Sequence, residues 1–329
     1  MVLNGRYIIS ITIIMVSIIF FLISINERNL LKQEKIKQIT AQGLSVRKYL
    51  GLEADGFKKF QGAGVNVAII DTGIAVHDDI KSNRILEFKD FVAGKNEPYD
   101  DNGHGTFIAG IIGADGKVKG IAPKVNFVVI KAMDKSGDVD KDRLIIALEW
   151  LVENQKKYNI KVVNLSLGGS PFIKNNDDLL LKKVHELDQA GVIIVTSAGN
   201  ISSRYNTILS PGTSSDVVTV GGVKNNRTYS IQDDKLASFS PEGYRQNGII
   251  KPDIVTLGVD ILSLDYKRTN SYITHSGTSV STAIVSGAAA IMFEKYSVSS
   301  SSIKKIIINN AIKLKNESEL KQGNGELHF

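Results

Sequence analysis

The chain contains no cysteine, which excludes disulfide bonds, thiolate nucleophiles and cysteine-ligated metal sites. It also has little charge imbalance: 40 basic and 34 acidic residues give a formal net charge of +6, and no arginine-rich block is present. We therefore expect no nucleic-acid partner. The 329 residues do include 43% hydrophobic side chains and 29 glycines, which is typical of a folded α/β protein with one large domain or two ordinary ones.

The longest apolar stretch lies at residues 8–25 and contains only hydroxyl side chains as polar interruptions. As a helix it would span roughly 27 Å, just enough to cross the hydrocarbon core of a bilayer. A cleaved signal peptide is the alternative, but no small-residue cleavage site follows the stretch. We therefore predict a single N-terminal transmembrane helix, with residues 1–26 as membrane anchor or signal sequence.

Residues 27–50 are charged and polar and are predicted to form a juxtamembrane tether before a folded domain at residues 51–329. One basic residue, Arg6, precedes the apolar stretch, whereas four follow it closely: Arg28, Lys32, Lys35 and Lys37. Counted alone, these charges would place the folded domain in the cytoplasm.

From residue 65 onward, short β-branched runs alternate with helical patterns. Strands are predicted at residues 65–70, 125–130, 160–167, 192–195 and 217–220, and helices at 140–156 and 177–190. Continuous apolar strands of this kind are typical of strands buried on both faces. The alternation predicts an α/β fold, a parallel sheet with helices on both faces.

Three positions carry potential catalytic chemistry. Asp71 ends the first buried run, His104 lies between glycines at the start of a helix, and Ser279 opens an apolar helix. Each has an ordinary structural explanation: an Asx turn, a loop histidine satisfied by neighbours, and a serine N-cap. Together they are the side chains of a serine nucleophile, its base and the acid that orients the base.

The sequences around these positions resemble the subtilisin-like serine proteases (subtilases). Five segments match in the family's order: VAIIDTGI at 67–74, GHGT at 103–106, NLSLGG at 164–169, SAGN at 197–200 and GTS at 277–279. Residues 251–255 (KPDIV) also match the segment that precedes the serine, and the resemblance runs from about residue 51 to the C-terminus. It implies the family's three-layer fold for this part of the chain, with residues 323–327 as its last strand.

The resemblance implies that Ser279 is the nucleophile, His104 the general base, Asp71 its orienting acid and Asn200 the amide of the oxyanion hole. It also implies that an extended peptide substrate pairs with an edge at Ser166, Leu167, Gly168 and Gly169, opposite a second edge at residues 132–137. Substrate contacts are further expected at Ser197, Ala198 and Gly199, and Leu209 is expected near the floor of an apolar pocket. After Ser279 the chain departs from the family's usual residues at positions 280–284, none of which carries the chemistry.

No cofactor is expected. Calcium is possible by family resemblance, but the segment at residues 113–119 is short where many relatives build a calcium loop, and Asp79 supplies only one candidate carboxylate. The resulting hypothesis is a serine endopeptidase held at the cell membrane through residues 8–25. Its catalytic domain is expected outside the cytoplasm despite the charge count, and a single secreted peptide is one candidate substrate. The alternative is a non-catalytic peptide-binding pseudoprotease on the same fold.

Overall fold

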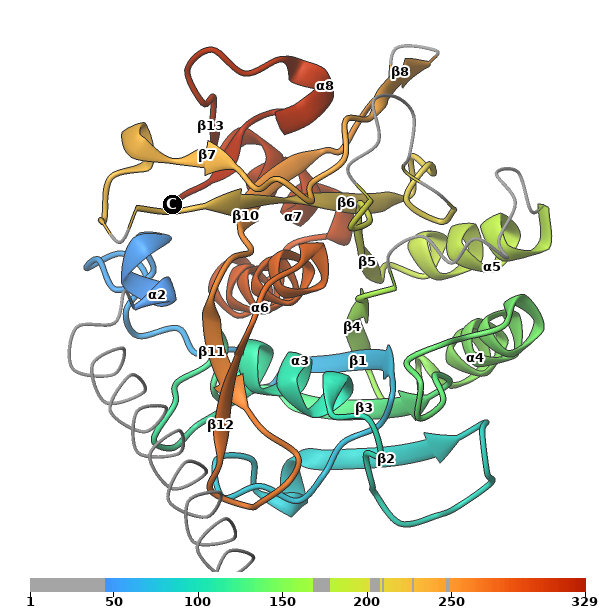
Figure 1. Cartoon of the computed structure of the whole chain (residues 1–329). Coiled ribbons are helices and arrows are strands. Elements are labelled where there is room, and N and C mark those ends of the chain that lie inside the picture. The colour runs from blue at the N-terminus through green and yellow to red at the C-terminus, as the bar shows by residue number, and fades with distance from the viewer. Residues whose placement is uncertain (1–44, 168–177, 202–207, 209, 227, 247–248) are drawn as a thin grey trace, which may run out of the picture. The chain divides into compact units, whose positions relative to one another are not determined.

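A ten-stranded, mostly parallel sheet organises the residues that the computed structural model describes, which are 45–167, 178–201, 208, 210–226, 228–246 and 249–329 (Figure 1). The strand order is β13-β14-β10-β6-β5-β4-β1-β3-β2, and β7 pairs with β6. Among the described strands of this sheet, only β13 and β7 run antiparallel to their neighbours, and two separate antiparallel sheets pair β8 with β9 and β11 with β12. The strands are β1 (Asn66–Asp71), β2 (Ile85–Asp90), β3 (Asn126–Lys131), β4 (Ile160–Leu165), β5 (Ile193–Ser197), β6 (Val217–Lys224), β7 (Lys235–Leu236), β8 (Tyr244–Gln246), β9 (Ile249–Lys251), β10 (Ile254–Leu257), β11 (Ile261–Leu264), β12 (Tyr272–His275), β13 (Ala311–Ile312) and β14 (Glu326–Leu327).

The strand β1 lies inside the sheet, between β3 and β4, and is buried along almost its whole length. Its Val-Ala-Ile-Ile core suits this position because β-branched side chains pack well on both faces of a covered parallel sheet. The register places Asp71 of β1 beside Lys131 of β3. Catalytic side chains are expected beyond the carboxyl ends of such strands.

Helices cover both faces of the sheet. The described helices are α2 (Val46–Tyr49), α3 (His104–Gly113), α4 (Lys141–Asn154), α5 (Asp178–Gln189), α6 (Thr278–Tyr296), α7 (Ser300–Asn309) and α8 (Glu319–Gln322), with 3₁₀ turns η1 (Ser82–Arg84) and η2 (Ile231–Asp233). In Figure 1, α3 and α6 lie on one face and α4 and α5 on the other. Leu144, Leu148, Leu180 and Val184 pack onto the second face with side chains of β1, β3, β4 and β5. The predicted parallel α/β fold is therefore confirmed.

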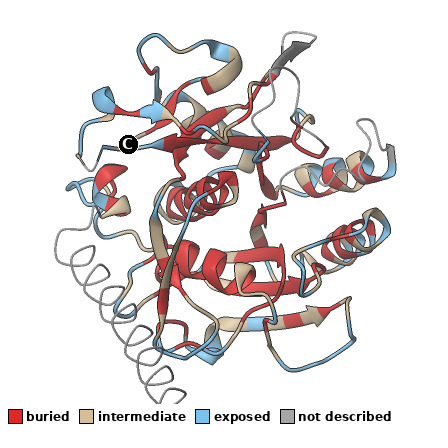
Figure 2. Cartoon of the chain, viewed as in Figure 1, coloured by how far each residue is buried: buried red, intermediate tan, exposed pale blue. Residues whose placement is uncertain are grey.

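The helix α6 is buried along most of its length (Figure 2). Its residues from Val280 to Met292 are all buried, and most are small. Small side chains let the helix lie close to its neighbours: a Cβ on Gly287 would lie 3.4 Å from the carbonyl oxygen of Ile112 in α3 and 2.6 Å from Cβ of Ile121 in the segment that follows α3. This packing fixes the position of the helix N-terminus, where Ser279 lies.

The compact unit begins at Ser45, so it includes the last residues of the predicted tether. Tyr49 and Leu50 are completely buried. The backbone N–H of Phe329 donates to the carbonyl of Leu50, 2.8 Å away, which ties residues 45–50 to the end of the chain. Six residues are too few to show an apolar periodicity that would indicate this packing.

The predicted membrane anchor at residues 8–25 lies outside the described residues. Within residues 45–329, as far as the structure describes them, no helix combines the length and apolar character needed to cross a membrane.

Candidate active site

Asp71 and His104 form a direct hydrogen-bonded pair. His104 is the first residue of α3, and its Nδ1 lies 2.7 Å from Oδ1 of Asp71, the last residue of β1. Asp71 is fully buried, whereas the His104 side chain is 29% exposed. The imidazole therefore has one nitrogen held by a carboxylate and one edge open toward solvent, as a general base that meets a substrate requires.

Two glycines allow the end of β1 to approach the start of α3. A Cβ on Gly105 would lie 2.1 Å from the carbonyl oxygen of Gly73, and a Cβ on Gly73 would lie 2.0 Å from the carbonyl oxygen of Tyr99. Gly73 also has φ +120, which side chains strongly disfavour. Close packing thus requires glycine at both positions, because any larger residue would separate Asp71 from His104.

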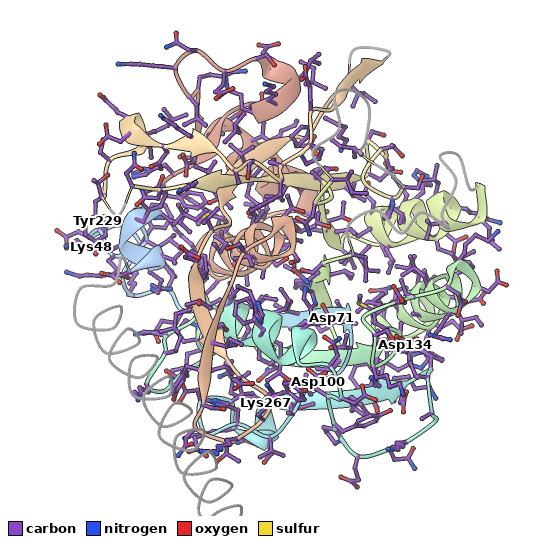
Figure 3. All side chains as sticks on the ribbon, in the orientation of Figure 1. Lys48, Asp71, Asp100, Asp134, Tyr229 and Lys267 are labelled. Carbon is purple, nitrogen blue, oxygen red and sulfur yellow. The ribbon has the colours of Figure 1, made fainter. Side chains whose placement is uncertain are left out.

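A second buried carboxylate, Asp100, organises the segment that precedes His104 (Figure 3). Its Oδ1 accepts hydrogen bonds from the Thr72 hydroxyl at 2.9 Å and the Gly103 N–H at 2.7 Å. Its Oδ2 accepts from the backbone N–H and the hydroxyl of Thr106, at 2.9 and 2.7 Å. Asp100 therefore fixes both the residue after Asp71 and the first turn of α3.

The charges around His104 favour its protonated form. Burial alone would lower the pKa of His104, but the charge and hydrogen bond of Asp71, with a further contribution from the charge of Asp100, raise this pKa above its ordinary value. An imidazolium formed during a reaction would be stabilised at this position.

Ser279 lies in the first turn of α6, beside Asn200. A Cβ built on Gly277 would lie 3.3 Å from Oγ of Ser279 and 3.4 Å from Nδ2 of Asn200, so the hydroxyl and the amide flank one small space. Oδ1 of Asn200 accepts from the backbone N–H of Thr278 at 2.8 Å and from its hydroxyl at 3.1 Å. Holding the oxygen in this way leaves the amide N–H₂ as the donor available to the space next to Ser279.

The serine and the histidine belong to neighbouring helices. Phe107 of α3 packs edge-on against His275, four residues before Ser279, with ring centroids 4.7 Å apart. Among the residues that the structure describes, the Ser279 hydroxyl has no hydrogen bond with His104 or any other group. Such catalytic hydrogen bonds are often long in a free enzyme and shorten when substrate binds.

Five of the predicted substrate-binding residues lie at the carboxyl ends of β4 and β5. These residues are Ser166, Leu167, Ser197, Ala198 and Gly199. Their side chains are buried, or absent in the case of the glycine, so any substrate contact would come from the backbone. The Ser166 hydroxyl donates to the carbonyl of Ser279 at 3.0 Å and accepts from Asn164 at 2.8 Å, so it braces the nucleophile's helix. Gly168, Gly169 and Leu209 fall outside the described residues.

The candidate calcium ligand Asp79 is occupied by protein donors. Its carboxylate accepts hydrogen bonds from the backbone N–H groups of Lys117 and Val118, at 3.1 and 2.8 Å, and from the Tyr272 hydroxyl at 3.2 Å. No group of three or more metal-ligating side chains occurs within the described part of the chain. The residues around Asp79 therefore fit a hydrogen-bonded turn rather than a calcium site, which would need 6–8 oxygen ligands.

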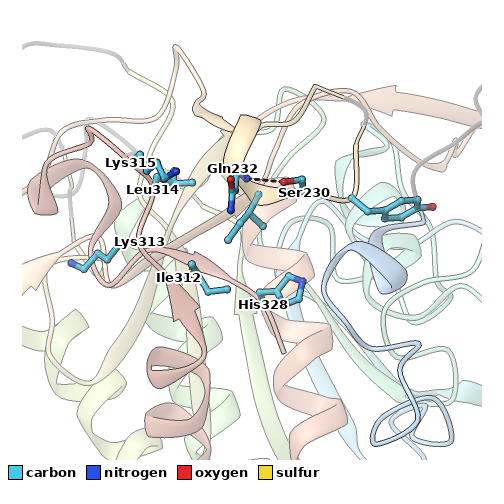
Figure 4. Close-up of a pocket in the computed structure, with 9 residues that line it drawn as sticks. Ser230, Gln232, Ile312, Lys313, Leu314, Lys315 and His328 are labelled. Atoms are coloured by element: carbon cyan, nitrogen blue, oxygen red, sulfur yellow. Dashed lines mark hydrogen bonds between the residues drawn. The ribbon is translucent and has the colours of Figure 1, made fainter.

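A shallow cavity of about 400 Å³ lies elsewhere, between η2 and the segment around β13 (Figure 4). Its lining includes Ser230, Gln232, Lys313 and His328, and no residue predicted for catalysis or substrate binding contributes to it. The cavity is therefore a different place from the site predicted at Asp71, His104 and Ser279.

Some residues that orient the site were given no role from the sequence. Thr72, Asp100 and Thr278 make the hydrogen bonds that fix Asp71, His104 and Asn200. The available signal was their position within or next to the matched motifs, since each lies within four residues of a predicted catalytic residue.

Comparison with known proteins agrees with this geometry. The sequence model described as "Subtilase family" matches residues 62–325. Serine protease AprX of Bacillus subtilis (strain 168) is 36% identical over 292 residues, covering 81% of this chain and 65% of AprX, so the chain spans slightly less than two thirds of that relative. Subtilisin DY of Bacillus licheniformis is 32% identical over 284 residues, covering 84% of this chain and 93% of subtilisin DY.

Among solved structures, Sphericase superposes with a TM-score of 0.72 at 27% sequence identity, covering 86% of this chain and 96% of Sphericase. The family's sequence model thus spans most of the chain, and the two relatives named above align over 81% and 84% of it. The chain belongs to the subtilase family of subtilisin-like serine endopeptidases.

Proposed function

We propose that this chain hydrolyses peptide bonds with Ser279 as nucleophile, His104 as general base and Asp71 as the acid that orients the base. The observation that carries the proposal is the 2.7 Å contact between His104 Nδ1 and the buried Asp71 carboxylate. A carboxylate bound to Nδ1 keeps the proton on that nitrogen and leaves Nε2 free to accept a proton from the serine hydroxyl.

The reaction then follows two stages. Ser279 Oγ attacks the scissile carbonyl while His104 takes the hydroxyl proton, and the imidazolium returns that proton to the leaving amine. Water repeats the sequence on the acyl-enzyme, with His104 again as base. The charge and hydrogen bond of Asp71, which raise the pKa of His104, stabilise the imidazolium in both stages. As the pH falls, His104 therefore becomes protonated, and inactive as a base, at a higher pH than a free imidazole would.

Two donors are proposed to bind the oxyanion. The backbone N–H of Ser279 lies in the first turn of α6, where helical N–H groups have no partner within the helix. The Asn200 amide is oriented because Thr278 holds its oxygen, so its nitrogen needs no rearrangement to donate. Donors already in place stabilise developing charge better than donors that must reorient.

The proposed substrate is a peptide or protein in extended conformation. Backbone at residues 166–169 and 132–137 would pair with it, and an apolar pocket near Leu209 would favour an uncharged side chain before the cleaved bond. A single secreted peptide remains our candidate for the natural substrate. Sequencing the products from a random peptide library would measure this preference, and cleavage after basic residues would contradict the apolar pocket.

The test of the chemistry is covalent labelling with a fluorophosphonate at neutral pH, together with hydrolysis of an unstructured peptide pool. Wild type should be labelled and active, and Ser279→Ala should lose both. Ser276→Ala is the matched control, since Ser276 is an exposed serine three residues earlier that only accepts a hydrogen bond from Asp260. Folded wild type that binds peptides but is neither labelled nor active would support the alternative of a peptide-binding pseudoprotease.

We further propose that residues 8–25 anchor the protein in the cell membrane and that the subtilase domain lies outside the cytoplasm. The support is the length and apolar character of this stretch. Protease added to intact cells should then remove a C-terminal tag. Complete protection of the tag, with digestion after lysis, would reverse the orientation.

A further inference from the structure

Lys131 is a buried cation beside the proposed triad. It is the last residue of β3, its side chain is 0% exposed, and it is paired in register with Asp71. Its ammonium group donates to the carbonyl of Thr72 at 2.6 Å, to Oδ1 of Asp101 at 2.6 Å and to the carbonyl of Met133 at 3.1 Å. A lysine ammonium has three hydrogens, so every donor is used.

The three acceptors belong to three different parts of the site. Thr72 directly follows Asp71, Asp101 precedes His104 by three residues, and Met133 lies in the predicted second substrate edge at residues 132–137. The Thr72 hydroxyl also accepts the N–H of Gly105, at 2.9 Å, in the first turn of α3. One side chain thus joins the orienting acid, the segment carrying the base and a backbone edge for substrate.

We propose that Lys131 is a positioning residue for the triad: its ammonium group holds the Asp71 segment, the His104 segment and the edge at residues 132–137 in one fixed arrangement. The inference rests on the proposed function, because it assigns Lys131 a part in that reaction. Lys131 itself does not touch substrate in this role.

The charge of Lys131 also acts on the site. Several charged or aromatic groups lie next to it on the packed elements: Asp71 of β1 and Asp90 of β2 in register, the Tyr99 ring, Asp101, and Asp134, near which Arg143 of α4 also lies. A cation bonded to the residue after Asp71 should oppose the carboxylates that favour protonated His104. Removing Lys131 should therefore raise the pKa of His104, and removing the negative charge of Asp101 should lower it.

The chain contains a matched control in Lys251. This lysine is also 0% exposed and donates to one carboxylate and to backbone, namely Oδ2 of Asp253 at 2.7 Å and the carbonyl of Val217 at 3.0 Å. None of its partners belongs to the triad or to the substrate edges. Replacing either lysine with methionine removes a buried cation and its hydrogen bonds, so both changes should lower thermal stability.

The experiment compares Lys131→Met, Lys251→Met and Asp101→Asn by kcat/KM against pH and by NMR titration of His104 in a Ser279→Ala background. We expect Lys131→Met to lower kcat/KM by roughly 10- to 100-fold per folded molecule and to move its acid limb to higher pH. Lys251→Met should change neither. The Asp101 side chain is 42% exposed, so Asp101→Asn should fold even if Lys131→Met does not, and its acid limb should move to lower pH.

Equal activity and equal His104 titration in Lys131→Met and Lys251→Met would overturn the proposal, as would an unmoved His104 titration in Asp101→Asn. The NMR titration needs no turnover. If wild type shows no Ser279-dependent hydrolysis, the proposed function fails, while the coupling of Lys131 to His104 is still measured.

Discussion

Replacing Glu326 with glutamine should stabilise the protein, and the gain should grow as pH rises. Glu326 of β14 is completely buried, and its Oε1 lies 2.6 Å from the Tyr49 hydroxyl, which also contacts Asp234. A tyrosine hydroxyl has one hydrogen, so both contacts can be hydrogen bonds only if one carboxyl is protonated and donates to the tyrosine oxygen. Burial, with the nearby charge of Asp234, raises the pKa of Glu326 to about 9.

The direction follows from the two pKa values. The unfolded chain releases the Glu326 proton near pH 4.5, whereas the folded protein keeps it to about pH 9. Between these two pH values the folded state binds one proton more at Glu326 than the unfolded state does. The free energy of unfolding therefore falls as pH rises, by up to about 1.4 kcal/mol per pH unit, and the fall ends above pH 9. Glutamine has no proton to release and can donate its amide to Asp234, so the variant should not show this fall.

The assay is thermal unfolding at pH 6, 7, 8 and 9, with Ser279→Ala in every protein to prevent self-digestion. The melting temperature of Glu326→Gln should rise relative to its parent by roughly 3–6 °C per pH unit at most, since about 1.4 kcal/mol per pH unit corresponds to this shift at about 2–4 °C per kcal/mol. Glu53→Gln is the control, because Glu53 is exposed and bonded only to Ser45 at the surface. A difference between Glu326→Gln and parent that stays constant from pH 6 to 9 would show that Glu326 is ionised in the folded protein and would refute the reasoning.

Three other predictions concern the site and the turn at Asp79. Asn200→Ala should lower kcat by about 10²–10³-fold with little change in KM, which is the effect of removing one oxyanion-hole donor in subtilisin. Steady-state kinetics would measure this, and an unchanged kcat would remove Asn200 from the mechanism. Asp71→Asn should lower the pKa of His104, since the Asp71 carboxylate raises it; NMR titration in a Ser279→Ala background measures the shift, and an unmoved pKa would contradict the pairing. Asp79→Ala should lower stability by about 1–3 kcal/mol, because it leaves the N–H groups of the 117–118 turn without an acceptor, whereas a calcium chelator should leave the melting temperature unchanged. A fall in melting temperature with chelator would instead indicate a bound calcium ion.

The inner strands were predictable from the sequence because a strand covered on both faces must be apolar throughout. The runs at 65–70, 125–130 and 192–195 correspond to β1, β3 and β5 within one or two residues. Such strands depend little on which neighbours they meet, since both faces require the same kind of side chain.

Of the peripheral strands only β14, within residues 323–327, was predicted, through the family resemblance, and the sequences of the others explain why those were not. β2 alternates exposed and buried positions around Glu87 and Lys89, and the hairpin of β11 and β12 has only four residues in each strand. Short or half-exposed strands are defined by the neighbour they pair with, and sequence periodicity cannot identify that neighbour. The packing of residues 45–50 was missed for the same reason, because it depends on contacts with residues at the other end of the chain, such as Phe329 and Glu326.

At the site, the sequence indicated the chemical groups and the structure supplies the contacts that orient them. Two of these contacts share a pattern: the residue that orients one predicted catalytic group is adjacent in sequence to another. Thr72, next to Asp71, contacts the start of the His104 helix, and Thr278, next to Ser279, holds Asn200. These two motifs therefore each contain a predicted reacting group together with the anchor for a partner from a distant part of the chain. This arrangement explains why matched segments, rather than isolated Asp, His and Ser residues, distinguish a catalytic centre from an Asx turn, a loop histidine and a helix cap.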